Sequence, residues 1–297
     1  MVLATSCRQM HVVAQKGFHA TGSSGLYDRA RPSYPPALIR QLLAATGTRS
    51  PRVVEVGAGT GIATRLLLQE SAHVGGLSSL AAFDPSQGML EHLRRVLGNN
   101  DTGLVAALKA QGRLRPESRV WAAEGAFDDF QAGTGNDLVV IAQAWHWCPD
   151  FDAALRHIAA SLRPGGVLAL LWNLEDRDAA EWVAKVRDLY EQYEDHTPQY
   201  RHMLWHAMYD TPAYRQHFRA MTPVHMKRSL PTTLRGVLDR MLSKSYISVL
   251  DAGTRAQLVR QVQAVFDGGL CGREMLDEAQ GVWAYPYQTD LHMFRRR

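Results

Sequence analysis

Cysteine is scarce in this chain: three cysteines occur among 297 residues, and Cys7, Cys148 and Cys271 lie far apart. An odd and widely spaced set provides neither a disulfide framework nor the C-x-x-C spacing of metal and redox sites. Few, isolated cysteines are typical of reducing compartments. We therefore expect cytoplasmic localisation and no metal site.

Long hydrophobic runs are missing as well. No stretch reaches the roughly 18 apolar residues that a membrane-spanning helix needs, and the N-terminal residues lack the apolar core of a signal peptide. The sequence therefore predicts no membrane partner.

A strong excess of one charge sign is also absent. The 33 lysine and arginine residues are nearly balanced by 29 aspartate and glutamate residues, which gives a net charge of +4. Such a balance provides no basic groove for the phosphates of a nucleic acid. With 46% hydrophobic and 21% charged residues, the composition is that of a globular protein.

The sequence does contain an alternation of apolar strands and amphipathic helices. The predicted strands are RVVEV (52–56), SLAAFD (79–84), RVWAAEG (119–125), DLVVIAQ (137–143) and VLALLWN (167–173). Helical patterns occur at 37–45, 61–70 and 85–97, the last with Pro85 in its first turn, and residues 98–118 look like an insertion. Continuous apolar strands that alternate with helices indicate a parallel sheet covered on both faces.

The pattern changes after Asn173. Residues 174–222 are rich in aromatic, histidine and charged residues, and we predict a helical cap there. A strand at 223–230, helices at 233–242 and 253–266, and a closing strand at 283–294 are predicted to follow.

The turn after the first predicted strand, residues 57–61 (GAGTG), has three alternate glycines. Missing side chains let the backbone approach a ligand closely or take a positive φ. The dinucleotide fingerprint is G-x-G-x-x-G, but here the third glycine comes one residue early, with Ile62 in its place. Glu55, just before the turn, would repel a pyrophosphate and attract a cation. The turn therefore predicts a nucleoside-like ligand that is partly cationic.

Asp84 ends the second predicted strand. An acidic residue at this place in an α/β fold accepts hydrogen bonds from ribose hydroxyls. Dinucleotide and S-adenosylmethionine folds share this device, so Asp84 alone leaves both cofactors open.

Five motifs in order resemble those of the class I S-adenosylmethionine-dependent methyltransferases. They are E-x-G-x-G-x-G at 55–61, FDPSQGMLEHLR at 83–94, EGAF at 124–127, NDLVVIAQAWHW at 136–147 and LRPGGVLALLWN at 162–173. The resemblance implies an α/β, doubly wound, mostly parallel seven-stranded sheet of the Rossmann-like methyltransferase type. It also implies S-adenosyl-L-methionine as the cofactor.

Further stretches resemble one smaller group within this class of methyltransferases. GLYDRARPSYP at 25–35, the Gln-Ala-x-His-Trp run at 143–147, and the C-terminal SYISVL and YPYQTDL are similar to small-molecule methyltransferases. That group includes trans-aconitate methyltransferase and its fungal relatives, in the methyltransferase type 11 group. It implies that residues 1–34 fold over the cofactor, and that residues 35–297 form the methyltransferase domain with its substrate cap at about 174–222.

The resemblance also implies which residues bind the cofactor. The expected contacts are Tyr27, Arg31, Glu55, Gly57, Ala58, Gly59, Thr60, Gly61, Asp84, Pro85, Met89, Gly125, Ala126, Phe127, Gln143 and Ala144. Amides of the 57–61 turn would hold the methionyl carboxylate at a helix N-terminus. Asp84 would bind the ribose and residues 125–127 the adenine. For Met89 and Phe127, ordinary packing is the alternative.

His146 is the candidate catalytic residue, because it follows the fourth predicted strand at the edge where open α/β sheets bind ligands. It could act as a general base or form a hydrogen bond to the acceptor. We expect Trp145, Trp147 and Asn173 on the substrate side, with core packing as the alternative for the tryptophans. Arg31, with Arg201, Arg215 or Arg219 from the cap, could hold an acceptor carboxylate.

The predicted function is therefore methyl transfer to a small organic molecule, by O-methylation of a carboxylic acid or a hydroxylated metabolite. Enzymes that methylate base nitrogens carry an Asn/Asp-Pro-Pro-Tyr/Phe turn where this chain has residues 143–147, so no nucleic-acid partner is expected. The alternatives are a cofactor-binding protein without catalysis and a nicotinamide-dependent oxidoreductase. The oligomeric state stays open.

Overall fold

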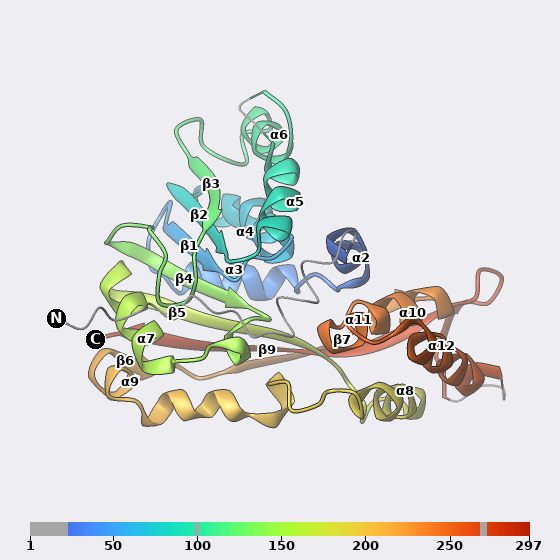
Figure 1. The fold of residues 1–297 in the computed structure, drawn as a ribbon. Helices are drawn as coiled ribbons and strands as arrows, with labels where there is room; N and C mark the ends of the chain where they lie inside the picture. The colour runs from blue at the N-terminus through green and yellow to red at the C-terminus, as the bar shows by residue number, and fades with distance from the viewer. Residues whose placement is uncertain (1–22, 99–100, 268–271) are drawn as a thin grey trace.

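The computed structural model describes residues 23–98, 101–267 and 272–297. Cys7, Cys271 and residues 1–22 of the expected 1–34 segment lie outside these ranges. The fold is built on one mixed sheet (Figure 1). Its strands are β1 (Arg52–Val56), β2 (Ser79–Asp84), β3 (Arg119–Glu124), β4 (Asn136–Ala142), β5 (Leu162–Glu175), β6 (Phe218–Ala220), β7 (Val224–Thr232), β8 (Met275–Asp277) and β9 (Val282–Arg296).

The strand order is β3-β2-β1-β4-β5-β9-β6, and β7 and β8 also pair with β9. The strands β1 to β5 are parallel, whereas β9 is antiparallel to β5, β6, β7 and β8. The predicted α/β, doubly wound architecture is confirmed. The described residues form nine strands instead of the expected seven, because the 15-residue β9 also pairs with the three-residue strands β6 and β8.

The predicted helices are also present, with small shifts at their ends. The α-helices are α2 (Ser23–Ala30), α3 (Pro36–Ala44), α4 (Ile62–Glu70), α5 (Gln87–Leu97), α6 (Leu104–Ala110), α7 (Phe151–Ser161), α8 (Glu181–Glu191), α9 (Pro212–His217), α10 (Leu234–Leu242), α11 (Ser245–Ser248) and α12 (Ala252–Asp267). The 3-10 helices are η1 (Ser71–Val74), η2 (Trp145–Trp147), η3 (Tyr200–His202) and η4 (Leu204–Asp210). Ser86 is the N-cap of α5, so Pro85 precedes this helix and does not lie in its first turn.

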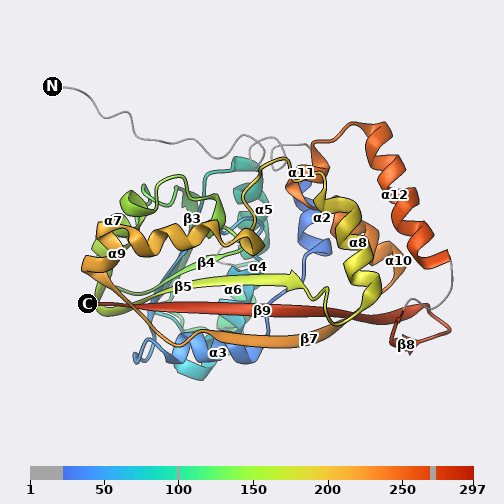
Figure 2. The same ribbon diagram turned by 90° about the horizontal axis from the view of Figure 1, so that it is seen from below.

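The parallel strands are buried on both faces, which explains their continuous apolar sequences. Along β4, Leu138 and Val140 pack into the cluster formed with α3, α4 and α6, while Val139 and Ile141 pack into the cluster formed with α7, η4 and α9. Figure 2 shows α3 and α7 on opposite sides of the sheet. Each face therefore has its own apolar core.

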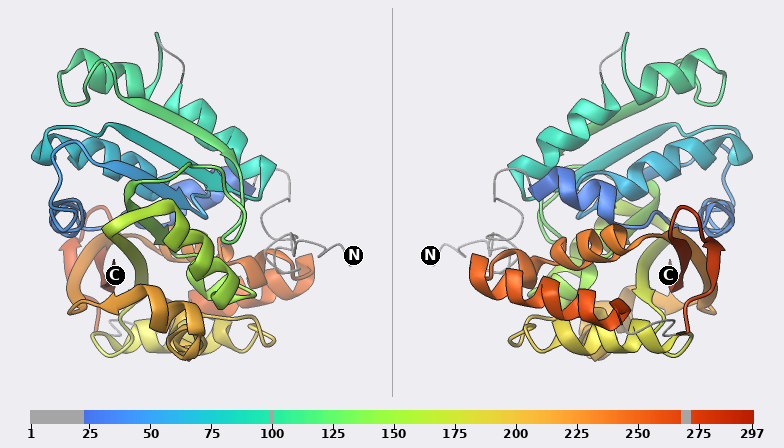
Figure 3. Two further views of the ribbon diagram at one scale, coloured as in Figure 1. Left: turned by 90° about the vertical axis from the view of Figure 1, so that its left-hand side faces the viewer. Right: turned by 90° about the vertical axis from the view of Figure 1, so that its right-hand side faces the viewer.

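A third apolar cluster lies at one end of the molecule. The helices α8, α10, α11 and α12, called here the end group, pack with Trp283, Tyr285 and Tyr287 of β9. Figure 3 shows α10 and α12 at the opposite end from α6. The expected cap at 174–222 is divided, because α8 belongs to the end group whereas η4 and α9 pack beside α7.

The strand order reverses between β1 and β4, which creates a crevice at the carboxyl ends of the parallel strands. The helix α2 lies near this edge and packs against α5 and α10 (Figure 1). The fold thus brings the helix α2, the glycine turn and the end group to the place where open α/β sheets bind ligands.

Candidate active site

The glycine turn connects β1 to α4, and its three glycines have different reasons to be glycine. All have positive φ, at 74° for Gly57, 57° for Gly59 and 86° for Gly61. A Cβ at Gly57 would lie 2.6 Å from the Cβ of Ala144, and one at Gly61 would collide with Leu93. A Cβ at Gly59 would meet no atom within 4 Å. Packing therefore requires Gly57 and Gly61, while the open side of Gly59 leaves room for a ligand.

Most amides of this turn are used inside the protein. Those of Gly57 and Ala58 donate to the carbonyl of Phe83, at 2.8 and 3.0 Å, and that of Gly61 donates to the carbonyl of Ala58 at 2.9 Å. The first turn of α4 has no side-chain cap, and Ile62 and Ala63 line the adjoining pocket. The donors available for an anion are therefore the amides at the start of α4, just beyond the glycines that the sequence indicated.

Asp84 lies directly beside the turn. Its Oδ2 accepts a hydrogen bond from the amide of Gly59 at 2.8 Å, and its Oδ1 accepts from the amide of Ser86 at 2.8 Å. Asp84 is buried at the carboxyl end of β2, in register with Glu124 of β3. The structure thus brings together the acidic residue and the glycine turn, as the sequence predicted.

Glu55 is 1% exposed and accepts a hydrogen bond of 2.5 Å from the hydroxyl of Thr64. Burial raises the pKa of Glu55 to about 8, and the nearby carboxylate of Asp84 acts in the same direction. The Glu55 carboxyl group is therefore mostly protonated at neutral pH. A cation in the adjoining pocket would favour its ionised form.

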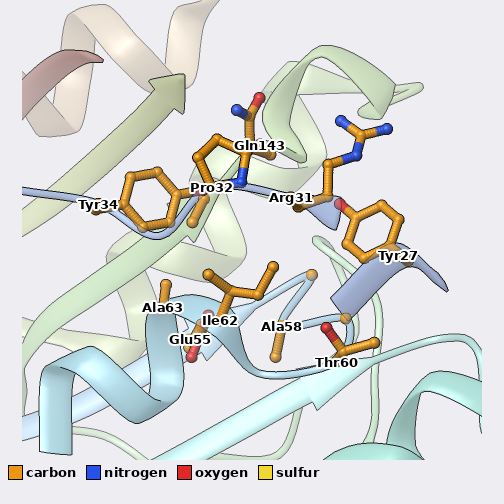
Figure 4. A pocket seen from close by; sticks show the side chains of 13 residues that line it. Tyr27, Arg31, Pro32, Tyr34, Glu55, Ala58, Thr60, Ile62, Ala63 and Gln143 are labelled. Atoms are coloured by element: carbon orange, nitrogen blue, oxygen red, sulfur yellow. The ribbon is translucent and has the colours of Figure 1, made fainter. Parts of the chain in front are cut away.

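A pocket lies between the glycine turn and the N-terminal segment (Figure 4). Tyr27 and Arg31 lie across it from Glu55 and Thr60. The lining residues are Tyr27, Arg31, Pro32, Tyr34, Glu55, Gly57, Ala58, Gly59, Thr60, Ile62, Ala63, Ala142 and Gln143. Sequence reasoning missed Pro32, Tyr34, Ile62, Ala63 and Ala142, whose aliphatic or aromatic side chains carry no signal beyond the motifs that they flank.

Arg31 is held in place at the edge of this pocket. Its guanidinium donates to the hydroxyl and the carbonyl of Ser243, at 3.0 and 2.9 Å, and stacks on the ring of Tyr27 at 4.7 Å. Arg31 therefore joins the N-terminal segment to the end of α10.

Several expected cofactor contacts do not line the pocket of Figure 4. Met89 is buried inside the fold, whereas Phe127 is partly buried and packs edge-on against Trp145, with ring centroids 5.6 Å apart. Pro85, Gly125, Ala126 and Ala144 are partly exposed near the strand ends.

The segment after β4 separates two pockets. Gln143 has a φ of +58° and donates from its amide group to the carbonyl of Asn173 at 2.8 Å. It lines both the pocket of Figure 4 and a second pocket. Trp145 is buried in the core, where its indole N–H points to the sulfur of Met208 at 3.2 Å. The structure thus favours core packing for Trp145, while Trp147 is partly buried with its ring 5.2 Å from that of His146.

The second pocket, called here the charged pocket, lies between β5, η3 and the end group. Its lining residues are Arg31, Gln143, His146, Asn173, Leu174, Glu175, Tyr190, Glu191, Glu194, Gln199, Tyr200, Arg201, Arg240, Lys244 and Tyr246. It shares Arg31 and Gln143 with the pocket of Figure 4, so the two pockets adjoin. Arg201 lines it as expected, but Arg215 pairs with Asp210 at the surface and Arg219 is exposed on β6.

A buried charge cluster forms one wall of the charged pocket. Glu175 is 0% exposed, and its Oε1 lies 2.7 Å from the guanidinium of Arg240 and 3.3 Å from the ammonium of Lys244. Arg240 is 4% exposed, and its Nε and Nη1 have no hydrogen-bond partner among the described residues. Burial lowers the pKa of Lys244 to about 7, although Glu175 opposes this shift.

Asn173 is occupied by structural hydrogen bonds. Its amide group donates to the carbonyls of Pro32 and Ser33, at 3.2 and 3.1 Å, and its Oδ1 accepts from Thr289 at 2.6 Å. Asn173 thus ties the N-terminal segment to the sheet, although it also lines the charged pocket.

In the part of the chain that the structure describes, no helix combines the length and the apolar character that a membrane span requires. In the same residues, no group of three or more histidine, cysteine or acidic side chains is placed to hold a metal ion.

Comparisons with known proteins identify the family. The family model described as "Methyltransferase domain" matches residues 27–230. A relative in Mycobacterium tuberculosis, "Uncharacterized methyltransferase Rv3342", is 31% identical over 275 residues, which cover 89% of this chain and 90% of the relative. The malonyl-[acyl-carrier protein] O-methyltransferase of Paenibacillus sp. is 28% identical over 118 residues, 40% of this chain and 37% of that protein.

A solved structure agrees with this result. A structure assigned as a type II methyltransferase, from Anaeromyxobacter dehalogenans, aligns with a TM-score of 0.57 and 20% identity, covering 89% of this chain and 97% of that chain. At that identity the likeness shows the fold alone. The family match covers most of the chain and therefore decides for the methyltransferase hypothesis over the oxidoreductase hypothesis. This chain belongs to the methyltransferase domain family and is an S-adenosylmethionine-dependent methyltransferase.

Proposed function

We propose that this enzyme transfers a methyl group to the carboxylate oxygen of a small organic acid. One observation carries the proposal: Arg240, which lines a pocket that adjoins the glycine turn, is buried and has two guanidinium nitrogens without a hydrogen-bond partner among the described residues. Arg240 is flanked there by Arg31 and Lys244.

The pocket of Figure 4 fits the methionyl part of the cofactor. The uncapped amides at the start of α4 would hold its carboxylate, Glu55 would face its ammonium group, and Asp84 would accept hydrogen bonds from the ribose. When bound, S-adenosylmethionine supplies a sulfonium methyl group: as the acceptor oxygen bonds to that carbon, the C–S bond breaks, its electron pair stays on sulfur, and a methyl ester and S-adenosylhomocysteine result.

The charges of the second pocket favour an anionic acceptor. Four basic residues line it (Arg31, Arg201, Arg240 and Lys244) against three acidic residues (Glu175, Glu191 and Glu194). Glu191 already pairs with Arg187 and Arg201, and Glu194 pairs with Arg201. A buried donor without a partner costs about 1–3 kcal/mol, and a carboxylate that accepts from the free nitrogens of Arg240 would remove this cost.

The named function of one relative is compatible with this chemistry. The Paenibacillus protein is named an O-methyltransferase that acts on malonyl-[acyl-carrier protein], although it matches only 40% of this chain. Side chains of several elements line the charged pocket, and a concave site of this kind suits a small acid better than the surface of a macromolecule.

A methyl-transfer screen tests the proposal. Labelled S-adenosylmethionine would be incubated with the enzyme and with panels of organic acids, phenols, amines, bulk RNA and a protein extract. We expect label in the organic acids, as methyl esters that mild base hydrolyses to release methanol. Label confined to base-stable ethers, amines, RNA or protein would contradict the proposed acceptor, while leaving the methyltransferase assignment intact.

A further inference from the structure

A hydrogen bond between Trp172 and His146 determines which nitrogen of the histidine carries its proton. The indole Nε1 of Trp172 lies 3.1 Å from Nδ1 of His146. An indole N–H can only donate, so Nδ1 of His146 must be the acceptor. A neutral His146 therefore carries its hydrogen on Nε2.

The surroundings of His146 favour the neutral ring. Protonation of the neutral ring would add a hydrogen to Nδ1, the atom at which the N–H of Trp172 already points. Burial lowers the pKa of His146 to about 3, and the positive charge of Arg31 adds to this shift. Neutral His146 with a hydrogen on Nε2 is thus the form present over the physiological pH range.

The Nε2 atom of His146 is available to a ligand. His146 lines the charged pocket together with Arg31, Arg240 and Lys244. Among the described residues, Nε2 makes no hydrogen bond. The pocket therefore receives an N–H donor from His146 and no lone pair that could remove a proton.

We propose that His146 donates a hydrogen bond from Nε2 to the acceptor carboxylate and does not act as a general base, and that Trp172 is the positioning residue that sets this tautomer. The inference rests on the proposed function, because a carboxylate with a pKa near 4 is already ionised at neutral pH and has no proton to remove. One carboxylate oxygen forms the new C–O bond, while the other accepts from Nε2.

The same arrangement selects against hydroxyl acceptors. An alcohol or phenol must lose a proton during methylation, and its O–H would point at a nitrogen that already carries a hydrogen. Trp172 thus contributes to acceptor choice without touching the acceptor.

The tautomer can be measured without any acceptor. In ¹⁵N-histidine-labelled enzyme, NMR distinguishes protonated from unprotonated ring nitrogens, and His146→Gln identifies the His146 signals among the 12 histidines. We expect Nε2–H with an unprotonated Nδ1 between pH 5 and 8. An Nδ1–H tautomer, or titration of His146 near pH 6.5, would overturn the inference.

Trp172→Phe removes the indole N–H and should produce a mixture of both His146 tautomers. Trp205→Phe is the matched control, because Trp205 is buried in the same aromatic cluster, with ring centroids 4.9 Å apart, and its N–H has no acceptor among the described residues. We expect the control to leave the His146 tautomer unchanged. An equal effect of both variants would show that packing, and not the hydrogen bond, sets the tautomer.

Kinetics with an acid acceptor distinguish a hydrogen-bond donor role of His146 from a general-base role. His146→Gln keeps an N–H near the position of Nε2, so kcat/KM should stay within about tenfold of wild type, whereas His146→Ala should lose roughly tenfold to hundredfold. Equal losses in both variants would contradict the donor role. Failure of the acceptor screen is a separate outcome, because the NMR measurement needs no acceptor.

Discussion

The hydroxyl of Thr64 donates a hydrogen bond of 2.5 Å to the carboxyl group of Glu55, which is almost completely shielded from solvent beneath the glycine turn. Thr64 lies in the first turn of α4 and Glu55 near the end of β1, so the contact links two of the elements that line the pocket of Figure 4. Burial there keeps Glu55 mostly protonated at neutral pH. This has consequences for binding and for stability.

Binding of S-adenosylhomocysteine at pH 7 should release protons. The ammonium group of the ligand favours the ionised form of Glu55, so its pKa should fall from about 8 to below the working pH. Calorimetric titration in two buffers of different ionisation enthalpy measures the number of protons released. We expect between about one half and one for wild type, from the titration of one group, and none for Glu55→Gln. Release that persists in Glu55→Gln would assign the proton to another group.

Glu55 should also make the free enzyme less stable as the pH rises. Its pKa is about 8 in the folded state against 4.5 in the unfolded chain, so the folded protein keeps a proton that the unfolded chain has lost. The contribution of Glu55 is therefore fully present below pH 4.5 and is lost as the pH rises to about 8. The loss is on the order of 5 kcal/mol. In denaturant unfolding, the free energy of unfolding should fall less with rising pH for Glu55→Gln than for wild type. Parallel pH profiles of the two proteins would disprove this assignment.

Much of the cofactor side could be predicted from the sequence because its signals are local. A strand followed by alternate glycines, and an acidic residue at the end of the next strand, are read within a few residues, and the parallel sheet then brings Asp84 to Gly59. Which amides remain available to an anion could not be predicted in this way. The amides of Gly57 and Ala58 donate to the carbonyl of Phe83 on the neighbouring strand, and this contact is seen only in the structure.

The charged pocket was harder to predict because its residues come from distant elements. Arg240 lies within an ordinary amphipathic pattern on α10, and only the packing of the end group brings it to Glu175. Glu175 lies two residues beyond the predicted strand at 167–173, because β5 continues to Glu175 by pairing with β9. Trp145 was ambiguous because a strand-end tryptophan can face a pocket or the core, and here the core is favoured.

Gly59→Val should abolish cofactor binding without unfolding the enzyme. The substituted side chain would fill the open space beside the turn, and a β-branched residue is strained at a φ of +57°. Gly112→Val is the matched control, because Gly112 has a φ of +67° and equally open surroundings, and it lines neither the pocket of Figure 4 nor the charged pocket. We expect similar losses in melting temperature for both variants and loss of S-adenosylhomocysteine binding for Gly59→Val only. Normal binding by Gly59→Val would refute the assigned approach of the ligand.

The specificity constant for an acid acceptor should fall above about pH 7, because Lys244 then loses the charge that attracts a carboxylate. The charged groups that influence Lys244 are Glu175, Arg240, Arg31 and Arg187. kcat/KM reports the free enzyme, so at saturating cofactor its pH profile should bend near 7. Lys244→Gln should lower kcat/KM at pH 6 and remove the bend. A rate that instead rises through pH 7 in wild type would identify Lys244 as a base.

Arg240→Met should impair both acceptor binding and stability, and a second substitution should separate the two effects. Removing the guanidinium leaves the fully buried carboxylate of Glu175 with Lys244 as its remaining close partner, which should cost about 3–5 kcal/mol of unfolding free energy. The double variant Arg240→Met and Glu175→Met lacks the uncompensated charge. Its free energy of unfolding, measured with denaturant, should therefore recover most of that loss. Turnover of the acid acceptor should stay low, because the donors for its carboxylate remain absent. Recovery of activity together with stability would mean that Arg240 has only a structural role.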